Sequence, residues 1–481
     1  SELQGDTMSF VDVILLHGRL FPKRPAIMLM DRVVTFGMLG DAIHWVSARA
    51  LASGIRPGDT VVLAIDNPIR FIAVAYALMR LGVVIMPIAP GNVLKAPLVG
   101  AVAVLSDIPG PAPVGMRMLV VDDAWFQPGA EAYAVDPRAS DTGRLSIIAL
   151  TSGTTGQNKL VPLTVGEFDR RISDLYRYQP APGTERDLLL VGFSSIWALV
   201  QASRVLAAAR TLGFAQSAEE AARMIDLYQM GTVIGSPHQL SALIEAPGTV
   251  PASCSSLRLV KAGGGLATPA LVAAIRTRLC PNVIVIYGST EGGRIALATG
   301  DMVDIAPGCV GLVAPPTRVE IVDDEDRPMP AGELGRVRIL VDGGGKALTP
   351  GELYPDQTPD WFYPGDLGSI SADGMLVIAG RADDLINAGG LKVAPEQVED
   401  LVAGHPAIAE AAAFALPGAG GVDEIWLAVV PRQKIAAEEI IAHCRQRNAV
   451  LAPRHILVLQ AIPRTGMGKA ERARLKALAR G

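Results

Sequence analysis

The chain has no apolar run long enough to cross a membrane. The best candidate, near residues 71–88, is interrupted by Arg80 and falls short of the roughly twenty uncharged residues that a bilayer requires. Blocks of basic residues are also missing, because 43 Lys and Arg against 48 Asp and Glu give a net charge of −5 spread along the chain. These absences exclude a membrane span and argue against nucleic acid as the main partner.

Cysteine is scarce as well, and its four copies lack the C-x-x-C spacing of a structural zinc site. They are Cys254, Cys280, Cys309 and Cys444. Scattered cysteines of this kind are typical of reduced thiols, so we expect a cytoplasmic protein. Residues 1–7 precede Met8 and are interpreted as a cloning remnant that lies outside the fold.

What the chain does have is length and apolar content. Its 481 residues are 50% hydrophobic and 19% charged, which is typical of a globular protein with a large core and an appended domain. Strand-like and helical segments alternate over residues 10–90 and again over residues 188–287, where we expect strands at 188–191, 232–234, 257–260 and 283–287. This rhythm predicts an α/β fold with parallel-rich sheets covered by helices on both faces.

The pattern changes beyond residue 308. Residues 318–378 contain four strand-like runs and predict a β-rich subdomain, whereas the last hundred residues alternate helices and strands as a small α+β unit. The polar, glycine-flanked stretch 380–384 is typical of a linker. We therefore predict an N-terminal domain of residues 1–382 and a C-terminal domain of residues 383–481.

The stretch LSIIALTSGTTGQNKLV, residues 145–161, carries the most chemical information. An apolar run typical of a buried strand breaks into a loop of glycines and hydroxyls that ends at Lys159. Glycine lets backbone N–H groups approach an anion, and the hydroxyls and the lysine add donors that suit a polyphosphate. The loop is not a Walker motif, because Gln157 and Asn158 separate Gly156 from Lys159. Taken alone, such a cluster is more often a plain surface loop.

Four further motifs follow in order: YGSTE at 287–291, YPGD at 363–366, GRADD at 380–384 and PRTGMGK at 463–469. Together with the 151–159 loop, they strongly resemble the motifs of the adenylate-forming superfamily of acyl-CoA synthetases, peptide-synthetase adenylation domains and luciferases. The resemblance covers nearly the whole chain, from residue 35 to residue 469, and is closest to acyl and aryl acid:CoA ligases. It implies that the small C-terminal domain is mobile and carries a catalytic lysine.

The resemblance also implies an ATP site at the carboxyl ends of strands, where open α/β sheets place their ligands. The loop would hold the β- and γ-phosphates, Tyr287 and a glycine backbone would sandwich adenine, and Asp366 with Arg381 would bind the ribose. The implied nucleotide-binding residues are Thr151, Ser152, Gly153, Thr154, Thr155, Gly156, Lys159, Gly264, Gly265, Leu266, Tyr287, Gly288, Ser289, Asp366, Ile378 and Arg381.

Joining a carboxylate to the α-phosphate brings two anions together, so cations and donors are needed where charge concentrates. By resemblance, Thr290 would donate to the α-phosphate and Glu291 would bind Mg²⁺, which prefers oxygen ligands. Lys469 would bridge the attacking carboxylate and the α-phosphate. Outside a motif, a lysine near a C-terminus is usually a solvated charge, and Asp366 could be a turn residue. The stretch 380–384 could equally be a solvated linker.

The chain departs from the family pattern where the acid would bind. Ser194 stands there in place of a histidine that many members carry. A second departure lies after the 151–159 loop, outside the phosphate cradle proper, where Val165 replaces another frequent histidine. Residues 193–199 contain no aspartate to pair with a substrate ammonium, which disfavours an amino acid and favours an apolar or aromatic carboxylic acid. The candidate acyl-pocket residues are Phe193, Ser194, Trp197, Ser236, Pro237, Gly263 and Gly288.

We expect an ATP-dependent acid:CoA ligase that works in two half-reactions. Acid and ATP give acyl-AMP and pyrophosphate, and coenzyme A then displaces AMP to give the thioester. Lys469 must leave before the second step, so the small domain must turn, with Asp383 as the hinge and Gly389, Gly390 and Lys392 along the CoA passage. Two alternatives stay open: transfer to the phosphopantetheine of an acyl carrier protein, and a non-catalytic nucleotide-binding relic. The retained motif residues speak against the relic.

Overall fold

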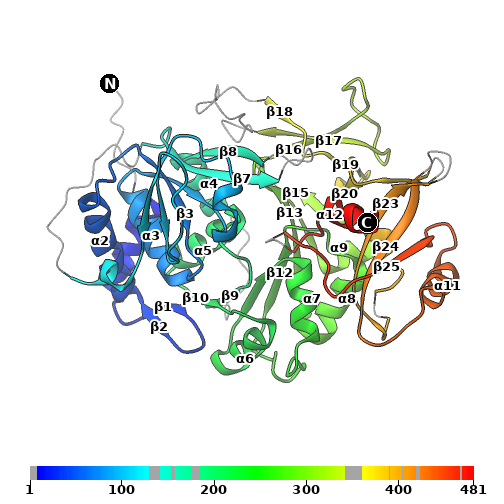
Figure 1. The fold of residues 1–481 in the computed structure, drawn as a ribbon, viewed down its shortest axis with the longest axis horizontal. Coiled ribbons are helices and arrows are strands. Elements are labelled where there is room, and N and C mark those ends of the chain that lie inside the picture. The colour runs from blue at the N-terminus through cyan, green and yellow to red at the C-terminus, as the bar shows by residue number, and fades with distance from the viewer. Residues whose placement is uncertain are drawn as a thin grey trace.

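The computed structural model describes residues 8–128, 141–152, 158–174, 185–341, 360–388, 391–403, 405–418, 423–465 and 468–480. Figure 1 shows a large body, coloured blue to yellow, with the orange and red C-terminal elements beside it. Among the described residues, no helix is long and apolar enough to span a membrane. The four cysteines are buried free thiols.

The first part of the body is a six-stranded sheet in the order β6-β5-β3-β4-β7-β8. Its strands are β3 (Thr60–Ala64), β4 (Val84–Pro87), β5 (Ala101–Ser106), β6 (Arg117–Val120), β7 (Leu145–Ser152) and β8 (Asn158–Thr164). β8 runs antiparallel to β7, and the other pairings are parallel. The helical segments of this part are α1 (Phe10–Leu20), α2 (Phe36–Ala52), α3 (Pro68–Arg80), η1 (Pro90–Lys95), η2 (Asp123–Phe126) and α4 (Val165–Asp174).

The second sheet has fourteen strands and changes character along its width. One half is mainly parallel: β1 (Pro25–Met28), β2 (Val33–Thr35), β9 (Arg186–Leu189), β10 (Thr211–Phe214), β11 (Thr232–Gly235), β12 (Leu259–Gly263) and β13 (Val283–Ser289). The other half is antiparallel: β14 (Gly293–Thr299), β15 (Cys309–Val313), β16 (Arg318–Val322), β17 (Gly335–Val341), β18 (Asp360–Phe362), β19 (Asp366–Ile370) and β20 (Met375–Arg381). The predicted α/β fold with a β-rich subdomain is confirmed.

Helices cover both faces of the parallel half. Leu189 and Ile234 pack with α5 (Ile196–Ala207) on one face. Leu188 and Val233, which point to the opposite face because side chains alternate along a strand, pack with α6 (Ala218–Tyr228) and α7 (Pro237–Glu245). α8 (Pro269–Arg278) and α9 (Gly300–Ile305) complete the body. α5 is thus fixed between the two sheets of the body.

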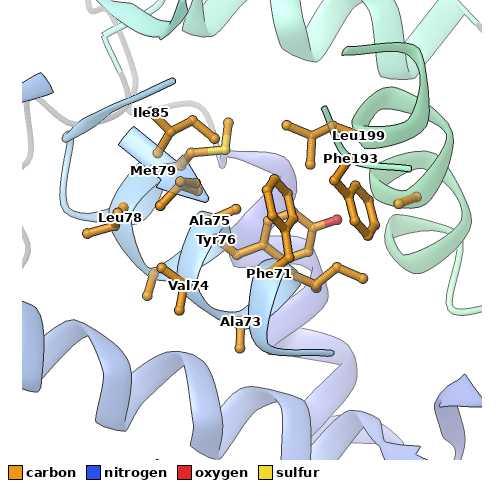
Figure 2. Close-up of a cluster of buried hydrophobic side chains, with 14 of the residues drawn as sticks. Phe71, Ala73, Val74, Ala75, Tyr76, Leu78, Met79, Ile85, Phe193 and Leu199 are labelled. Carbon is orange, nitrogen blue, oxygen red and sulfur yellow. The ribbon is translucent and has the colours of Figure 1, made fainter. Parts of the chain in front are cut away.

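The core between α3 and α5 is aromatic (Figure 2). The ring of Phe71 stacks on that of Phe193 with centroids 4.5 Å apart, and the hydroxyl of Tyr76 lies 3.0 Å from Ser203 Oγ. This hydrogen bond satisfies a polar group that would otherwise be buried without a partner. Phe193, a candidate acyl-pocket residue, is 7% exposed and belongs to this core.

The C-terminal elements have hydrophobic clusters of their own, formed by side chains between residues 386 and 479. The elements are β21 (Ile386–Ala388), β22 (Leu391–Val393), α10 (Pro395–Glu399), β23 (Ile408–Pro417), β24 (Asp423–Pro431), α11 (Ala437–Arg447), β25 (His455–Val458) and α12 (Arg472–Arg480). β23, β24 and β25 form one small sheet. A separate core gives this part of the chain the means to hold its own shape.

Two strands of the body differ from the sequence prediction. The strand expected at 188–191 is Arg186–Leu189, and the strand expected at 257–260 is Leu259–Gly263. Each contains a buried charged residue, Asp187 or Lys261. Charged side chains are seldom buried, so a hydrophobicity pattern places strand ends at them. The predicted positions were wrong because these two charges lie inside the sheet.

Candidate active site

A cleft of about 1330 Å³ lies between the body and the C-terminal elements, and both contribute to its walls. The body supplies the ends of β12 and β13, the turn after β13 and the first residues of β19. The C-terminal elements supply, among others, Glu396, Glu399, Glu410, Arg464, Lys469 and Arg472. All five motifs found in the sequence contribute to the walls of the cleft, the GRADD stretch through Gly380, Arg381 and Asp384.

Asp366 lies at one end of this cleft between two partners. The hydroxyl of Tyr287 donates to its Oδ2 at 2.5 Å, and Arg381 Nη1 lies 3.9 Å from its Oδ1. Asp366 and Arg381 are opposed across the β19–β20 pair, so the sheet register holds them together. Burial raises the pKa of Asp366, and the hydroxyl of Tyr287 and the guanidinium of Arg381 oppose that rise. Burial and the neighbouring carboxylate raise the pKa of Tyr287.

The turn between β13 and β14 carries Thr290 and Glu291. Ser289 Oγ accepts from the backbone N–H of Gly292 at 2.9 Å and closes the turn. Burial raises the pKa of Glu291, against the backbone hydrogen bond and the cations Lys159 and Arg171. A buried carboxylate flanked by cations is a suitable ligand for Mg²⁺, which takes oxygen ligands.

Arg171 of α4 fixes the backbone of this turn through two hydrogen bonds. Its Nη1 donates to the carbonyl of Thr290 at 2.8 Å, and its Nη2 donates to the carbonyl of Glu291 at 2.9 Å. Burial lowers the pKa of Arg171 to about 10. Sequence reasoning missed this residue because it belongs to no motif. The one signal was its place on an amphipathic helix that directly follows the phosphate-binding loop and its strand.

Lys469 reaches the cleft from the C-terminal side. The preceding Gly468 has φ +78°, and a Cβ there would lie 2.8 Å from the side chain of His238 on α7. Glycine therefore allows this turn to lie directly against the body. Loss of hydration lowers the pKa of the Lys469 ammonium, as does the charge of Arg381, whereas Asp366 and Asp384 oppose that effect.

The segment that carries Lys469 is attached to the rest of the C-terminal elements at both ends. On one side, Arg464 Nε lies 3.0 Å from Glu410 of β23, and its Nη1 donates to the Gly468 carbonyl at 2.8 Å. On the other side, Arg472 makes ion pairs with three carboxylates: Glu396 at 2.9 Å, Glu399 at 3.1 Å and Asp384 at 3.5 Å. The C-terminal elements also contact the body through an exposed ion pair between Arg432, which follows β24, and Glu245 of α7, at 2.9 Å.

The predicted site residues fall into three groups. Those that line the cleft are Thr151, Lys159, Ser194, Trp197, Pro237, Gly264, Gly265, Leu266, Tyr287, Gly288, Ser289, Thr290, Glu291, Asp366, Ile378, Arg381 and Lys469. Those elsewhere are Phe193 in the core, Ser236 as the buried N-cap of α7, Gly263 beneath Trp197, and Asp383 in an exposed turn. Outside the described part of the chain lie Gly153, Thr154, Thr155, Gly156, Gly389, Gly390 and the side chains of Ser152 and Lys392.

This fold and its two-sided cleft define the class of adenylate-forming enzymes. The sequence matches the AMP-binding enzyme family over residues 17–346 and the AMP-binding enzyme C-terminal domain over residues 397–469. The chain belongs to the AMP-binding enzyme family, and the superfamily expected from the motifs is confirmed.

Relatives of this chain are named for different acceptors. A medium/long-chain-fatty-acid–CoA ligase of Mycobacterium tuberculosis is 28% identical over 76% of this chain and 67% of its own length. A salicyl-AMP ligase / salicyl-S-ArCP synthetase of the same organism is 26% identical over 87% and 80%. The solved o-succinylbenzoate CoA synthetase of Bacillus subtilis, bound to its acyl-adenylate intermediate, aligns with TM-score 0.80 and 22% identity over 96% of this chain and 97% of its own.

Proposed function

We propose that the protein is an ATP-dependent carboxylic acid:CoA ligase that works through an acyl-adenylate. The observation that carries this proposal is the convergence of Lys469 with Tyr287, Asp366 and Arg381 on one cleft, from parts of the chain far apart in sequence. A non-catalytic relic would have no reason to keep a lysine, a carboxylate and a guanidinium together in a cleft. The two cations, Lys469 and Arg381, suit a reaction between two anions.

Each residue has a proposed task. Asp366 accepts hydrogen bonds from the ribose hydroxyls, and Arg381 adds a donor beside it. Thr290 donates to the α-phosphate, and Glu291 would hold Mg²⁺, which supplies positive charge to the phosphates when bound. Lys469 lies between the acid and the α-phosphate and stabilises the charge that builds up as they join.

Coenzyme A is our first choice of acceptor, and the phosphopantetheine of an acyl carrier protein is the second. Both acceptors present the same thiol, so the adenylating residues do not distinguish them. The named relatives include a CoA ligase and a synthetase that loads a carrier protein. We propose an apolar or aromatic acid, since the cleft wall beside Ser194 includes Ile196, Trp197 and Val200.

Lys469 is needed beside the α-phosphate in the first half-reaction and must make way for the thiol of the acceptor in the second. We therefore propose that the chain is divided into two domains, residues 1–382 and 383–481, that move relative to one another. Asp383 is exposed in a turn and lies outside the cleft, as a hinge residue should. Proline at this position would fix φ near −65°. We therefore expect Asp383→Pro to keep adenylation and nearly abolish thioester formation, as measured by pyrophosphate release and by thioester yield from supplied acyl-AMP. Normal rates of both would show that rotation about Asp383 is not needed.

The function itself is tested by pyrophosphate release with a panel of carboxylic acids, ATP and Mg²⁺, and with CoA or a carrier protein added as acceptor. Release that depends on the acid, followed by a thioester of CoA, is the expected result. Thioester formation only on the carrier protein would select the alternative acceptor. ATP binding without release for any acid would favour the relic.

A further inference from the structure

One face of α5 forms part of the acyl end of the cleft. Trp197, Gln201 and Arg204 are spaced four and three residues apart, so their side chains lie above one another along the helix. Trp197 packs over β12, with its ring 3.0 Å from the position of a Cβ on Gly263. Trp197 and Gln201 line the cleft, and Arg204 is buried below them.

Two polar atoms on this face have no partner. Within the described part of the chain, neither Nε1 of Trp197 nor Oε1 of Gln201 makes a hydrogen bond, and both atoms are buried. Gln201 as a whole is only 1% exposed to solvent. A buried donor or acceptor without a partner costs about 1–3 kcal/mol, so native proteins seldom keep one without a reason. The donor and the acceptor belong to two residues that line the cleft and lie one helical turn apart on α5.

The layer beneath these two side chains is charged. Lys261 lies two residues before Gly263 on the same face of β12 and is 6% exposed. Asp187 on β9 pairs with Arg204 at 3.4 Å and with Arg210 at 2.5 Å. Burial and the charge of Arg204 lower the pKa of Lys261 to about 7, and Asp187 opposes them. An acid that ended in an apolar tail here would leave the two unpaired atoms unsatisfied above a charged layer.

We propose that the acyl pocket takes a carboxylic acid that carries a hydroxyl group at the end remote from the reacting carboxylate, and that Trp197 and Gln201 hold this hydroxyl. This inference rests on the proposed function. Because both atoms are buried, the two side chains must turn toward the cleft as the acid binds. A hydroxyl then accepts from the indole Nε1–H and donates to Oε1, so that one group satisfies both atoms. A methyl group satisfies neither. A carboxylate accepts from the indole but places an acceptor against Oε1.

The expected discrimination is large, because sites built to hydrogen-bond a substrate hydroxyl reject the analogue that lacks it. We expect kcat/KM for pyrophosphate release to be at least ~100-fold higher for the hydroxy acid of a matched pair. The pairs are ω-hydroxy and unsubstituted fatty acids of equal length, and para-hydroxy and unsubstituted aryl acids. Dicarboxylic acids of the same lengths form a third arm.

Trp197→Phe keeps the ring and removes the donor, and Gln201→Met keeps the volume and removes the acceptor. Each should reduce the preference for the hydroxy acid to below ~10-fold, mainly by slowing the hydroxy acid. Gln216→Leu, at an exposed position away from the cleft, is the matched control and should keep the wild-type preference. Titration calorimetry of the same acids without ATP measures their affinity for the pocket independently of the reaction.

A wild-type enzyme that treats both members of every pair alike, prefers dicarboxylic acids, or keeps its preference in both variants would overturn the inference and leave the proposed function intact. No pyrophosphate release with any acid would overturn the proposed function instead. In that case calorimetry still decides the inference, since a hydroxy-acid preference lost in Gln201→Met supports it and equal binding of each pair refutes it.

Discussion

The two ends of the cleft differ in how their polar groups are satisfied. At the nucleotide end, Tyr287 and Arg381 both face Asp366, so these groups support one another without a ligand. At the acyl end, Trp197 Nε1 and Gln201 Oε1 lie buried with no partner in the described part of the chain. The groups at Asp366 are paired within the protein, whereas the partner that we propose for Trp197 and Gln201 is the bound acid.

This difference separates what the family shares from what is particular to the chain. Every member of an adenylate-forming superfamily handles the same nucleotide, so its contacts follow motifs. The acid varies among relatives, and the residues that read it follow no motif. Three of the predictions below test the roles proposed for Lys469, Arg171 and Asp366 in adenylation. The last tests whether burial of the Lys261 ammonium, below Trp197 and Gln201, lowers the stability of the fold.

The largest effect is expected for Lys469→Ala. Loss of a cation that stabilises the transition state should reduce adenylation by at least ~100-fold. Thioester formation from supplied acyl-AMP should survive, since the lysine has left by then. Single-turnover assays of the two half-reactions measure both effects. Equal losses in the two would make Lys469 a structural residue.

Arg171→Leu should follow, with a reduction of adenylation by roughly ten- to a hundredfold, because two hydrogen bonds to the Thr290 and Glu291 carbonyls are lost. A positioning role predicts that the Mg²⁺ concentration required for half-maximal rate rises as well, since Glu291 loses its support. Arg223→Leu, which removes an exposed arginine from α6, is the control. An unchanged Mg²⁺ dependence would leave Arg171 with a purely structural role.

Asp366→Ala should raise the KM for ATP and leave the KM for the acid nearly unchanged. Each charge-assisted hydrogen bond to the ribose contributes roughly 1.5–3 kcal/mol, so the KM for ATP should rise by about ten- to a hundredfold. Steady-state kinetics with ATP and acid varied separately provide the measurement. A normal KM for ATP would refute the assignment of Asp366 to the ribose.

The smallest effect, on stability alone, is expected for Lys261→Met. The folded-state pKa of Lys261, about 7, lies below the usual 10.5, so between these values the unfolded chain binds a proton that the folded chain does not. Stability from this group therefore increases with pH across that window, by up to about 1 kcal/mol per pH unit. Urea unfolding between pH 6.5 and 9.5 should show this increase in the wild type and a flatter profile in the variant. Parallel profiles would contradict it.

The sequence was enough to predict the fold class, because alternating elements are a local pattern. Its short motifs also picked out residues that line the cleft, such as Tyr287, Asp366 and Lys469, whose roles toward the nucleotide and the acid stay predictions. The sequence could not predict whether a candidate acyl-pocket residue would face the cleft or the hydrophobic core. Phe193 stands beside Ser194, yet it stacks on Phe71 in the core while Ser194 lines the cleft. Buried charges such as Lys261 break the hydrophobic pattern, and Arg171 acts through backbone carbonyls, which no motif records.

The double attachment of the segment that bears Lys469 has a consequence for the timing of turnover. Arg464 joins it to β23 and Arg472 joins it to α10 and Asp384, so Lys469 lies between two side chains that are anchored to the rest of the C-terminal elements. If Lys469 leaves the cleft between half-reactions, it travels with the whole C-terminal unit. A body of that size moves against the friction of the solvent. Raising the viscosity of the medium should then slow the passage from the first half-reaction to the second.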